Sequence, residues 1–272
     1  MIRKLSAALC AFALMGAAPA SDWRPLDPED TLVIDTTQGR VIVALAPAMA
    51  PLSVARVKLL AREGVYDGLQ FHRVIDGFVD QTGNPNNRDG GVSSHPDLPP
   101  EFTFKLKIAD YLAVSAPSDA TTGFFGAVPI QTVSGQEAVR STDGTIRAWG
   151  AYCPGVAGMG RQAAQDTGNS EIFFMRAASR RLDRDYTVWG RVVSGLEVVR
   201  LIKVGEPPAD PDRMLKVRVA ADIPAAERPR VSILSDRSPA FRTLVRQVRI
   251  AKGADFSICD VELPVRVEGA AP

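Results

Sequence analysis

One stretch in the first third of the chain gathers side chains that could bind and polarise a peptide. It runs from Tyr66 to Pro85, reads YDGLQFHRVIDGFVDQTGNP, and places Arg73 and Gln81 within short apolar runs. The pair Asp76-Gly77 separates these runs, and Asp-Gly readily adopts the positive φ angles of a tight turn between two strands. Alternate residues of a strand share a face, so Gln81 lies beside Val79. The pattern predicts either a groove with one strong donor and one amide, or a half-buried hairpin with a solvated arginine.

Three blocks of the sequence resemble the family of cyclophilin-type peptidyl-prolyl cis-trans isomerases. The first is the stretch already described, with its FHRV, Gly-Phe and Gln elements. The second is SEIFFMRA at Ser170–Ala177, and the third is LDRDYTVWGRVVSGLEVVRLI at Leu182–Ile202. The blocks follow the order of the family and cover most of Leu32–Ile202. The resemblance implies a mainly β fold, with a closed eight-stranded antiparallel barrel capped by two helices.

The resemblance also implies an activity that needs no cofactor and no metal. Rotation about an X-Pro peptide bond has a barrier of roughly 18–20 kcal/mol because of amide resonance. At the half-rotated state the proline nitrogen gains a free lone pair, and a donor aimed at it binds that state better than either planar state. Arg73 matches the arginine of the family, and a guanidinium is always charged and geometrically rigid. We therefore expect a peptidyl-prolyl isomerase with Arg73 as its catalytic residue.

Further positions match the substrate groove of the family. Gln81 would bond the substrate backbone, while Gly160 and Arg161 would line the groove for residues before the proline. The proline pocket and its surroundings would be formed by Phe78, Val79, Glu171, Phe173, Leu182 and Tyr186. Without the resemblance, each of these apolar residues would be read as plain core.

Two departures from the family pattern affect this expected site. Glu171 stands where the family has glutamine, and its carboxylate would either orient Arg73 or compete for it. Arg181 stands where the family has an aromatic residue, which would remove a wall of the pocket. We expect an active isomerase, one that could be slow, with an altered peptide preference. The alternative is a cyclophilin-like module that binds Pro-containing segments as a chaperone with little turnover. Retention of Arg73 favours the enzyme.

The sequence predicts three segments along the chain, the second of which carries an insertion. Residues 1–20 combine basic Arg3 and Lys4, an apolar run and Ala18-Pro19-Ala20, which is typical of a secretory signal peptide cleaved after Ala20. The isomerase domain would span 21–206, with an ordered insertion at about 105–152 that contains a turn at Thr121–Gly126. Residues 207–272 would form a small α+β extension with a strand at Met214–Val219 and a helix at Ser238–Ala251.

Charge and cysteine content limit the partners and the compartment. Removal of Arg3 and Lys4 leaves 30 basic residues against 31 acidic ones, so no basic surface for nucleic acid is expected. The expected partners are unfolded or extended Pro-containing chains. We expect an exported, periplasmic monomer that does not insert into the membrane after cleavage. Cys153 and Cys259 could bridge, which would be worth roughly 4–5 kcal/mol for so long a loop, or remain separate buried thiols. We favour the bridge because it would attach the extension to the barrel. The cysteines and histidines lack the spacing of a metal site.

Overall fold

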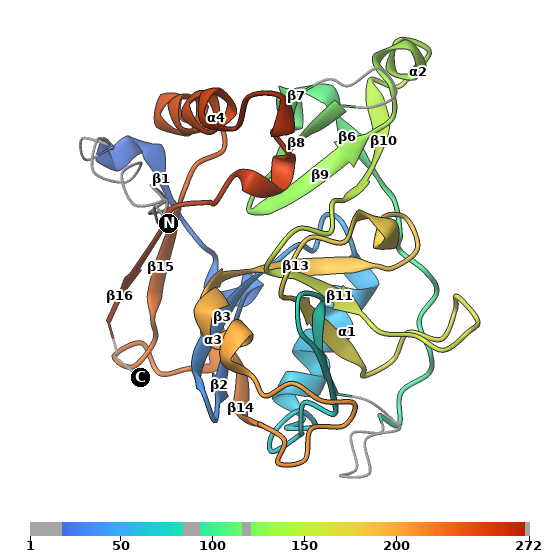
Figure 1. The fold of residues 1–272 in the computed structure, drawn as a ribbon, viewed down its shortest axis with the longest axis vertical. Helices are drawn as coiled ribbons and strands as arrows, with labels where there is room; N and C mark the ends of the chain where they lie inside the picture. Colours follow the sequence, from blue (N-terminus) through green and yellow to red (C-terminus); the bar gives the residue numbers. More distant parts are fainter. Residues whose placement is uncertain (1–17, 84–92, 116–120, 270–272) are drawn as a thin grey trace, which may run out of the picture.

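The computed structural model describes residues 18–83, 93–115 and 121–269. The predicted signal peptide falls mostly on residues outside these ranges. The largest sheet has eight antiparallel strands in the order β14-β2-β3-β13-β11-β12-β5-β4 and forms an open half-barrel (Figure 1). Its strands are β2 (Thr31–Thr36), β3 (Gly39–Leu45), β4 (Arg73–Ile75), β5 (Val79–Thr82), β11 (Val156–Met159), β12 (Ile172–Met175), β13 (Val188–Ser194) and β14 (Met214–Val219).

The predicted closure of this barrel is not confirmed. In the described chain, the end strands β4 and β14 are not paired with each other as strands. Isolated bridges from Gln70 to Arg213 and from Val74 to Gly205 join the two edges instead, together with backbone hydrogen bonds between residues 68–71 and 212–214. Strand β14 itself begins beyond residue 206, where the sequence placed the end of the isomerase domain, and pairs with β2 along its length.

The interior of the half-barrel is filled by alternate residues of its strands and by two helices. Ile172 and Phe174 of β12 point into this interior, while Phe173 and Met175 belong to a second apolar cluster on the other face. Successive side chains of a strand point to opposite faces, so this alternation shows that both faces of β12 are covered. Helix α1 (Pro51–Arg62) begins with Pro51 at a first-turn position. Buried side chains from α1 and from helix α3 (Leu196–Leu201) complete the interior cluster: Val54, Val57, Leu60, Val198 and Val199.

The insertion forms a sheet of its own, in the order β6-β10-β9-β8-β7, at the upper end of the molecule in Figure 1. Its elements are β6 (Phe104–Lys107), β7 (Leu112–Ser115), β8 (Thr121–Phe125), β9 (Val128–Thr132), α2 (Gly135–Val139) and β10 (Thr145–Gly150). The predicted turn at Thr121–Gly126 was wrong for residues 121–125, because they form β8. Gly123 allows β8 to pack closely against β7, since a Cβ there would lie 2.1 Å from the carbonyl oxygen of Leu112 on β7. The turn itself is at Gly126, with φ of 61°.

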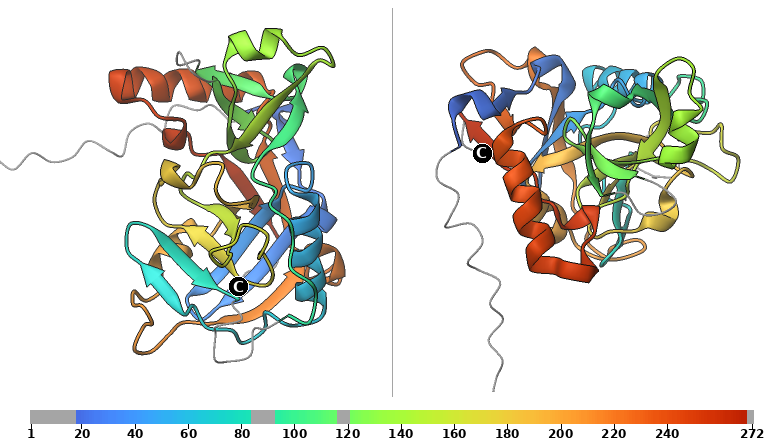
Figure 2. Two further views of the ribbon diagram at one scale, coloured as in Figure 1. Left: turned by 90° about the vertical axis from the view of Figure 1, so that its right-hand side faces the viewer. Right: turned by 90° about the horizontal axis from the view of Figure 1, so that it is seen from above.

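The two ends of the described chain meet in a third sheet. Strand β1 (Trp23–Pro25) pairs with β15 (Arg230–Leu234), which pairs with β16 (Val265–Glu268). Helix α4 (Pro239–Lys252) follows β15, and its N-cap Ser238 accepts a hydrogen bond from the backbone nitrogen of Phe241 at 3.0 Å. Both views of Figure 2 place α4 beside the insertion sheet. Cys153 and Cys259 form a disulfide that joins the insertion end to this tail.

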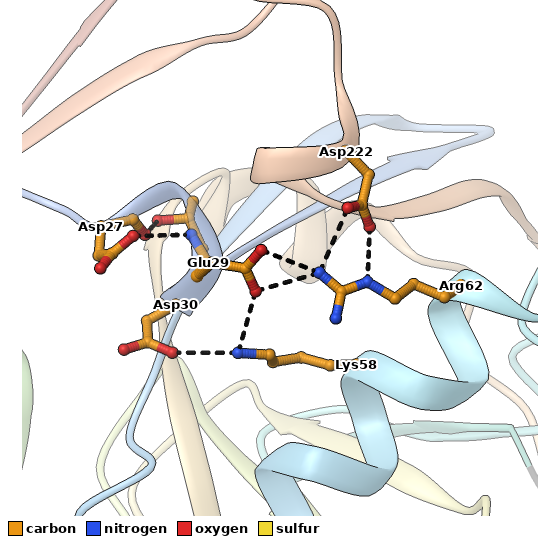
Figure 3. A network of polar contacts seen from close by, with 7 residues as sticks. Asp27, Glu29, Asp30, Lys58, Arg62 and Asp222 are labelled. Atoms are coloured by element: carbon orange, nitrogen blue, oxygen red, sulfur yellow. Dashed lines mark hydrogen bonds and ion pairs between the residues drawn. The ribbon is translucent and has the colours of Figure 1, made fainter.

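Charged side chains attach the N-terminal arm to helix α1 (Figure 3). Arg62 of α1 binds Glu29 at 3.0 Å and Asp222, which follows β14, at 2.9 Å. Lys58 lies 3.4 Å from both Glu29 and Asp30. Exposed pairs of this kind contribute about 0–1 kcal/mol each, so the network fixes the path of the arm more than it stabilises the fold.

Candidate active site

The register of four neighbouring strands aligns key residues of the expected site in one row. Arg73 of β4 is paired with Gln81 of β5, Gln81 with Phe173 of β12, and Phe173 with Gly158 of β11. Directly paired residues in antiparallel strands present their side chains on the same face. The predicted hairpin between β4 and β5 is present, but its turn has three residues, 76–78, rather than two, because Ile75 pairs with Val79; Gly77 in this turn has φ of 65°, whereas Asp76 has no positive φ. The row therefore places a cation, an amide and an aromatic ring side by side.

Arg73, Gln81 and Phe173 belong to one groove with a volume of about 390 Å³. The structure brings together all ten residues that the sequence assigned to catalysis or substrate binding, and adds Arg181 and Asp185. The lining consists of Arg73, Phe78, Val79, Gln81, Gly160, Arg161, Glu171, Phe173, Arg181, Leu182, Asp185 and Tyr186.

The floor of the groove is aromatic and rigidly packed. Phe173 is only 5% exposed, and a Cβ on Gly158 would lie 2.2 Å from its ring, so the glycine lets the ring rest on β11. The ring of Tyr152 stacks on Phe173 with centroids 5.8 Å apart. Tyr186 meets Phe173 edge to face, also at 5.8 Å. Such a surface can hold a small apolar ring without polar partners.

The insertion holds the loop that forms one wall of the groove. Arg181, Leu182 and Tyr186 lie in the segment 179–186, between β12 and β13. The backbone nitrogen of Tyr152, just after β10, donates to Asp183 at 3.0 Å. Further contacts are the hydrogen bond from the backbone nitrogen of Ser179 to the Tyr152 carbonyl at 2.9 Å, the bond from Arg180 to Gln131, and the guanidinium of Arg184 4.9 Å from the ring centre of Trp149.

The polar groups of the groove form a chain of hydrogen bonds. Arg73 donates from Nη1 to Oε1 of Gln81 at 3.0 Å, and Gln81 donates from Nε2 to Oε1 of Glu171. No ion pair joins Arg73 and Glu171 in the described residues. Instead, Nε of Arg73 contacts Glu206 at 2.7 Å. Glu171 therefore orients Gln81, and it is Glu206 that competes for the arginine.

Burial changes the titration of two groups beside Arg73. Burial raises the pKa of Glu171, and the Gln81 hydrogen bond and the Arg73 charge offset only part of that rise. A Cβ on Gly160 would lie 2.4 Å from Cγ of Glu171, so the glycine makes room for this carboxylate. Burial, with a contribution from the Arg73 charge, lowers the pKa of His72 to about 4. His72 is therefore neutral at pH 7.

The other two arginines of the groove lie on aromatic rings. Arg161 pairs with Asp185 at 2.7 Å and lies 4.5 Å from the ring centre of Tyr186. Arg181 lies 4.7 Å from the ring centre of Phe78. The expected loss of a wall at Arg181 was wrong, because its planar guanidinium covers the ring much as an aromatic side chain would.

Three residues of the site had no role in the sequence interpretation. Asp185 lies inside the third motif block, so its position could have been suspected, whereas Tyr152 ends the predicted insertion and lies outside all three blocks. Glu206 is 133 residues from Arg73 along the chain, and no local pattern connects the two. In the described part of the chain, no group of three or more His, Cys, Asp or Glu side chains could hold a metal ion.

Comparisons with known proteins agree with this geometry. Residues 31–219 match the model of the family described as cyclophilin type peptidyl-prolyl cis-trans isomerase/CLD. A probable peptidyl-prolyl cis-trans isomerase of Brucella suis is 31% identical over 231 residues, which cover 79% of this chain and 95% of the relative. Peptidyl-prolyl cis-trans isomerase B of Bacillus subtilis is 31% identical over 175 residues, which cover 64% of this chain and 87% of that protein.

A solved structure extends the likeness beyond the core sheet. The crystal structure of cyclophilin AquaCyp293 from Hirschia baltica matches with a TM-score of 0.84 and 31% identity, covering 92% of this chain and 95% of its own. Coverage this high includes most of the insertion and of the C-terminal extension. The chain belongs to the family of cyclophilin-type peptidyl-prolyl cis-trans isomerases and is an enzyme of that type.

Proposed function

We propose that Arg73 catalyses rotation of an X-Pro bond whose pyrrolidine ring lies on Phe173. The observation that carries this assignment is the row Arg73–Gln81–Phe173 across three directly paired strands. It fixes a guanidinium beside an apolar floor, which is where the proline nitrogen and the proline ring of one substrate residue would lie.

The chemistry follows from the change in the amide during rotation. In the planar states the proline nitrogen lone pair is delocalised and accepts a hydrogen bond poorly. In the twisted state the lone pair is free, and Arg73 donates to it. Because this bond is stronger in the twisted state than in either planar state, it lowers the barrier. Each tenfold of rate needs about 1.4 kcal/mol, which is within the range of one charge-assisted hydrogen bond.

The remaining groove residues bind and orient the substrate in this proposal. Gln81 is held between Arg73 and Glu171, so its amide has a fixed direction and its remaining hydrogen-bonding capacity can serve the substrate backbone. Phe78, Val79, Leu182 and Tyr186 enclose the ring, and Gly160 and Arg161 border the path of the residues before the proline.

One observation favours the alternative of a binding module with little turnover. Glu206 contacts Arg73, so the donor must leave or share this pair before it can serve a substrate. Retention of the aromatic floor would preserve peptide binding even where rotation is slow.

The test is NMR exchange between the cis and trans forms of a short X-Pro peptide, with wild type and Arg73→Ala in parallel. We expect acceleration by wild type, a large loss in Arg73→Ala, and retained peptide binding in both, because the floor is unchanged. Peptide binding by wild type without acceleration would refute the catalytic assignment and support the binding module.

We further propose that the enzyme acts on exported Pro-containing chains in the periplasm, as a monomer. The support is the signal-peptide pattern at residues 1–20 and the Cys153–Cys259 disulfide, since disulfides persist in oxidising compartments. In the described ranges, no helix is long and apolar enough to span a membrane. Cell fractionation, N-terminal sequencing of the exported form and sedimentation would test these points. Retention of residues 1–20 in a cytoplasmic product would contradict export.

A further inference from the structure

A second groove lies outside the active site, between strand β7 and helix α4. Its volume is about 420 Å³. Strand β7 is the end strand of the insertion sheet, and α4 lies next to that sheet in Figures 1 and 2. Neither element contributes a residue to the active-site groove. The lining residues come from these two elements alone: Leu112, Ala113, Val114, Arg242, Val245, Arg246, Arg249 and Ile250.

The helix side of this groove carries uncompensated positive charge. Helix α4 contains Arg242, Arg246, Arg249 and Lys252, and no acidic residue. The three arginines are spaced by four and three residues, so they share one face, where like charges destabilise a helix. In the described residues, Lys252 alone of these four has a carboxylate partner, Asp260 at 3.0 Å.

The hydrogen bonds of the three arginines leave their charge available. Arg242 donates to the carbonyl of Arg237 at 2.9 Å, and Arg249 donates to the carbonyl of Val114 on β7 at 2.6 Å. Both acceptors are neutral. Arg246 is exposed and has no partner in the described chain. Within the described ranges, the groove therefore presents three cations with no anion beside them.

The groove also has an apolar component. Val245 and Val114 are buried at its base, with 7% and 6% exposure, while Ile250 at the helix side is 76% exposed. An exposed isoleucine next to arginines matches a ligand that carries both carboxylates and an apolar side chain. The chain as a whole is nearly neutral, with a formal charge of +1, so its net charge adds little to the attraction at this groove.

We propose that this groove binds an extended, acidic polypeptide segment. The segment lies along β7, its carboxylates on Arg242, Arg246 and Arg249, and an apolar side chain on Ile250. Space between an edge strand and a helix has the shape of an extended chain, and edge strands recur in peptide recognition. Arginine is suited to carboxylates because its fork of donors binds both oxygens. A concave site of this kind fits a chain better than it fits a flat anionic membrane.

The experiment is a fluorescence anisotropy titration of the purified protein at low ionic strength. The probe is a fluorescein-labelled peptide of alternating Glu and Val without proline. We expect saturable binding, weakened at least tenfold by Arg246→Glu and clearly weakened by Ile250→Ser. The matched control is Lys105→Glu on β6, the opposite edge strand, where the side chain is 76% exposed. This control should bind the probe as wild type does, and all three variants should retain the wild-type isomerase rate.

Three outcomes would overturn the proposal. The first is equal binding by wild type and Arg246→Glu, or equal affinity for a peptide with Lys in place of Glu. The second is displacement of the probe by a short X-Pro substrate, which would place it in the active site. The third is no peptide binding together with binding of phosphatidylglycerol vesicles that Arg246→Glu abolishes, which would assign the groove to lipid.

Discussion

The charge of Arg181 predicts which proline-containing substrates this enzyme prefers. The active-site groove contains three arginines. Arg73 is paired with Glu206 and Arg161 with Asp185, whereas Arg181 has no carboxylate partner in the described residues. Its side chain is exposed and lies on the ring of Phe78, at the wall of the proline pocket. A substrate with Glu next to its proline can supply the missing partner.

The size of the effect follows from the exposure of the site. An exposed ion pair is worth about 0.2–1 kcal/mol, and a like charge in the same place is unfavourable by a similar amount. Replacing Glu by Lys beside the proline should therefore change the transition-state free energy by about 0.4–2 kcal/mol, or roughly 2- to 30-fold in kcat/KM. The ratio should shrink as salt rises from 0.05 to 0.5 M, because exposed charges are screened over about a Debye length.

The assay is NMR exchange on three peptides that differ only at the residue before the proline, with Glu, Gln or Lys. The uncatalysed rate of each peptide is subtracted. Arg181→Gln removes the charge and should reduce the Glu-to-Lys ratio to about that of the high-salt wild type. Arg181→Lys keeps the charge and should keep most of the preference. A second set of peptides varies the residue after the proline. Comparison of the two sets shows whether Arg181 contacts the residue before or after the proline.

Two results would refute this reasoning. One is a Glu-to-Lys ratio near one for wild type at low salt in both peptide sets. The other is a preference that survives in Arg181→Gln, which would assign it to Arg73 or Arg161. A general loss of rate in Arg181→Gln with an unchanged ratio would show that the side chain only covers Phe78.

Three further predictions concern the donor, the floor and the stability of the fold, the last through Asp80 of β5, which is buried and pairs with Arg176 at 2.9 Å. Glu206→Gln should raise kcat/KM by roughly 1.4- to 5-fold, because its pair with Arg73 is exposed (38% and 53%) and worth about 0.2–1 kcal/mol; a fall in rate would show that Glu206 positions the donor. Gly158→Ala should cost about 1–3 kcal/mol in urea unfolding and most of the activity, since its Cβ would lie 2.2 Å from the ring of Phe173; unchanged activity would contradict the packed floor. Burial raises the pKa of Asp80 to about 7, so its stabilising contribution is complete below its unfolded pKa of about 3.9 and is lost as pH rises through about 7. Unfolding free energies at pH 5 and 8 should differ less in Asp80→Asn than in wild type, and an equal difference in both would refute this.

The parts of the site that could be predicted from sequence are those that depend on short spacings. The Asp-Gly turn sets the register of β4 and β5, so Arg73 and Gln81 become neighbours through local geometry alone. Local spacing could not place Phe173 beside Gln81, because the two paired residues are ninety-two positions apart along the chain. The family motifs supplied that contact.

The remaining features depend on tertiary contacts that no spacing encodes. Glu206 meets Arg73 only because the segment after α3 returns beside β4. The Thr-Thr-Gly residues of β8 have the composition of a turn, and the packing of Gly123 against β7 overrides it. The position of strand β14 was predicted correctly. Its pairing with β2 could not be predicted, because the local pattern of β14 fits a strand of an appended unit equally well.

Each of the three sheets contains one tryptophan, whose fluorescence can report on the unfolding of that sheet. The chain has three tryptophans. Trp23 lies in β1 of the terminal sheet, Trp149 in β10 of the insertion sheet and Trp189 in β13 of the half-barrel. Their surroundings differ, because Trp189 is fully buried, whereas the guanidinium of Arg266 lies 3.8 Å from the ring centre of Trp23. Variants that keep one tryptophan each would therefore follow the unfolding of each sheet separately. Coincident transitions would mean that insertion, tail and catalytic core melt as one cooperative unit.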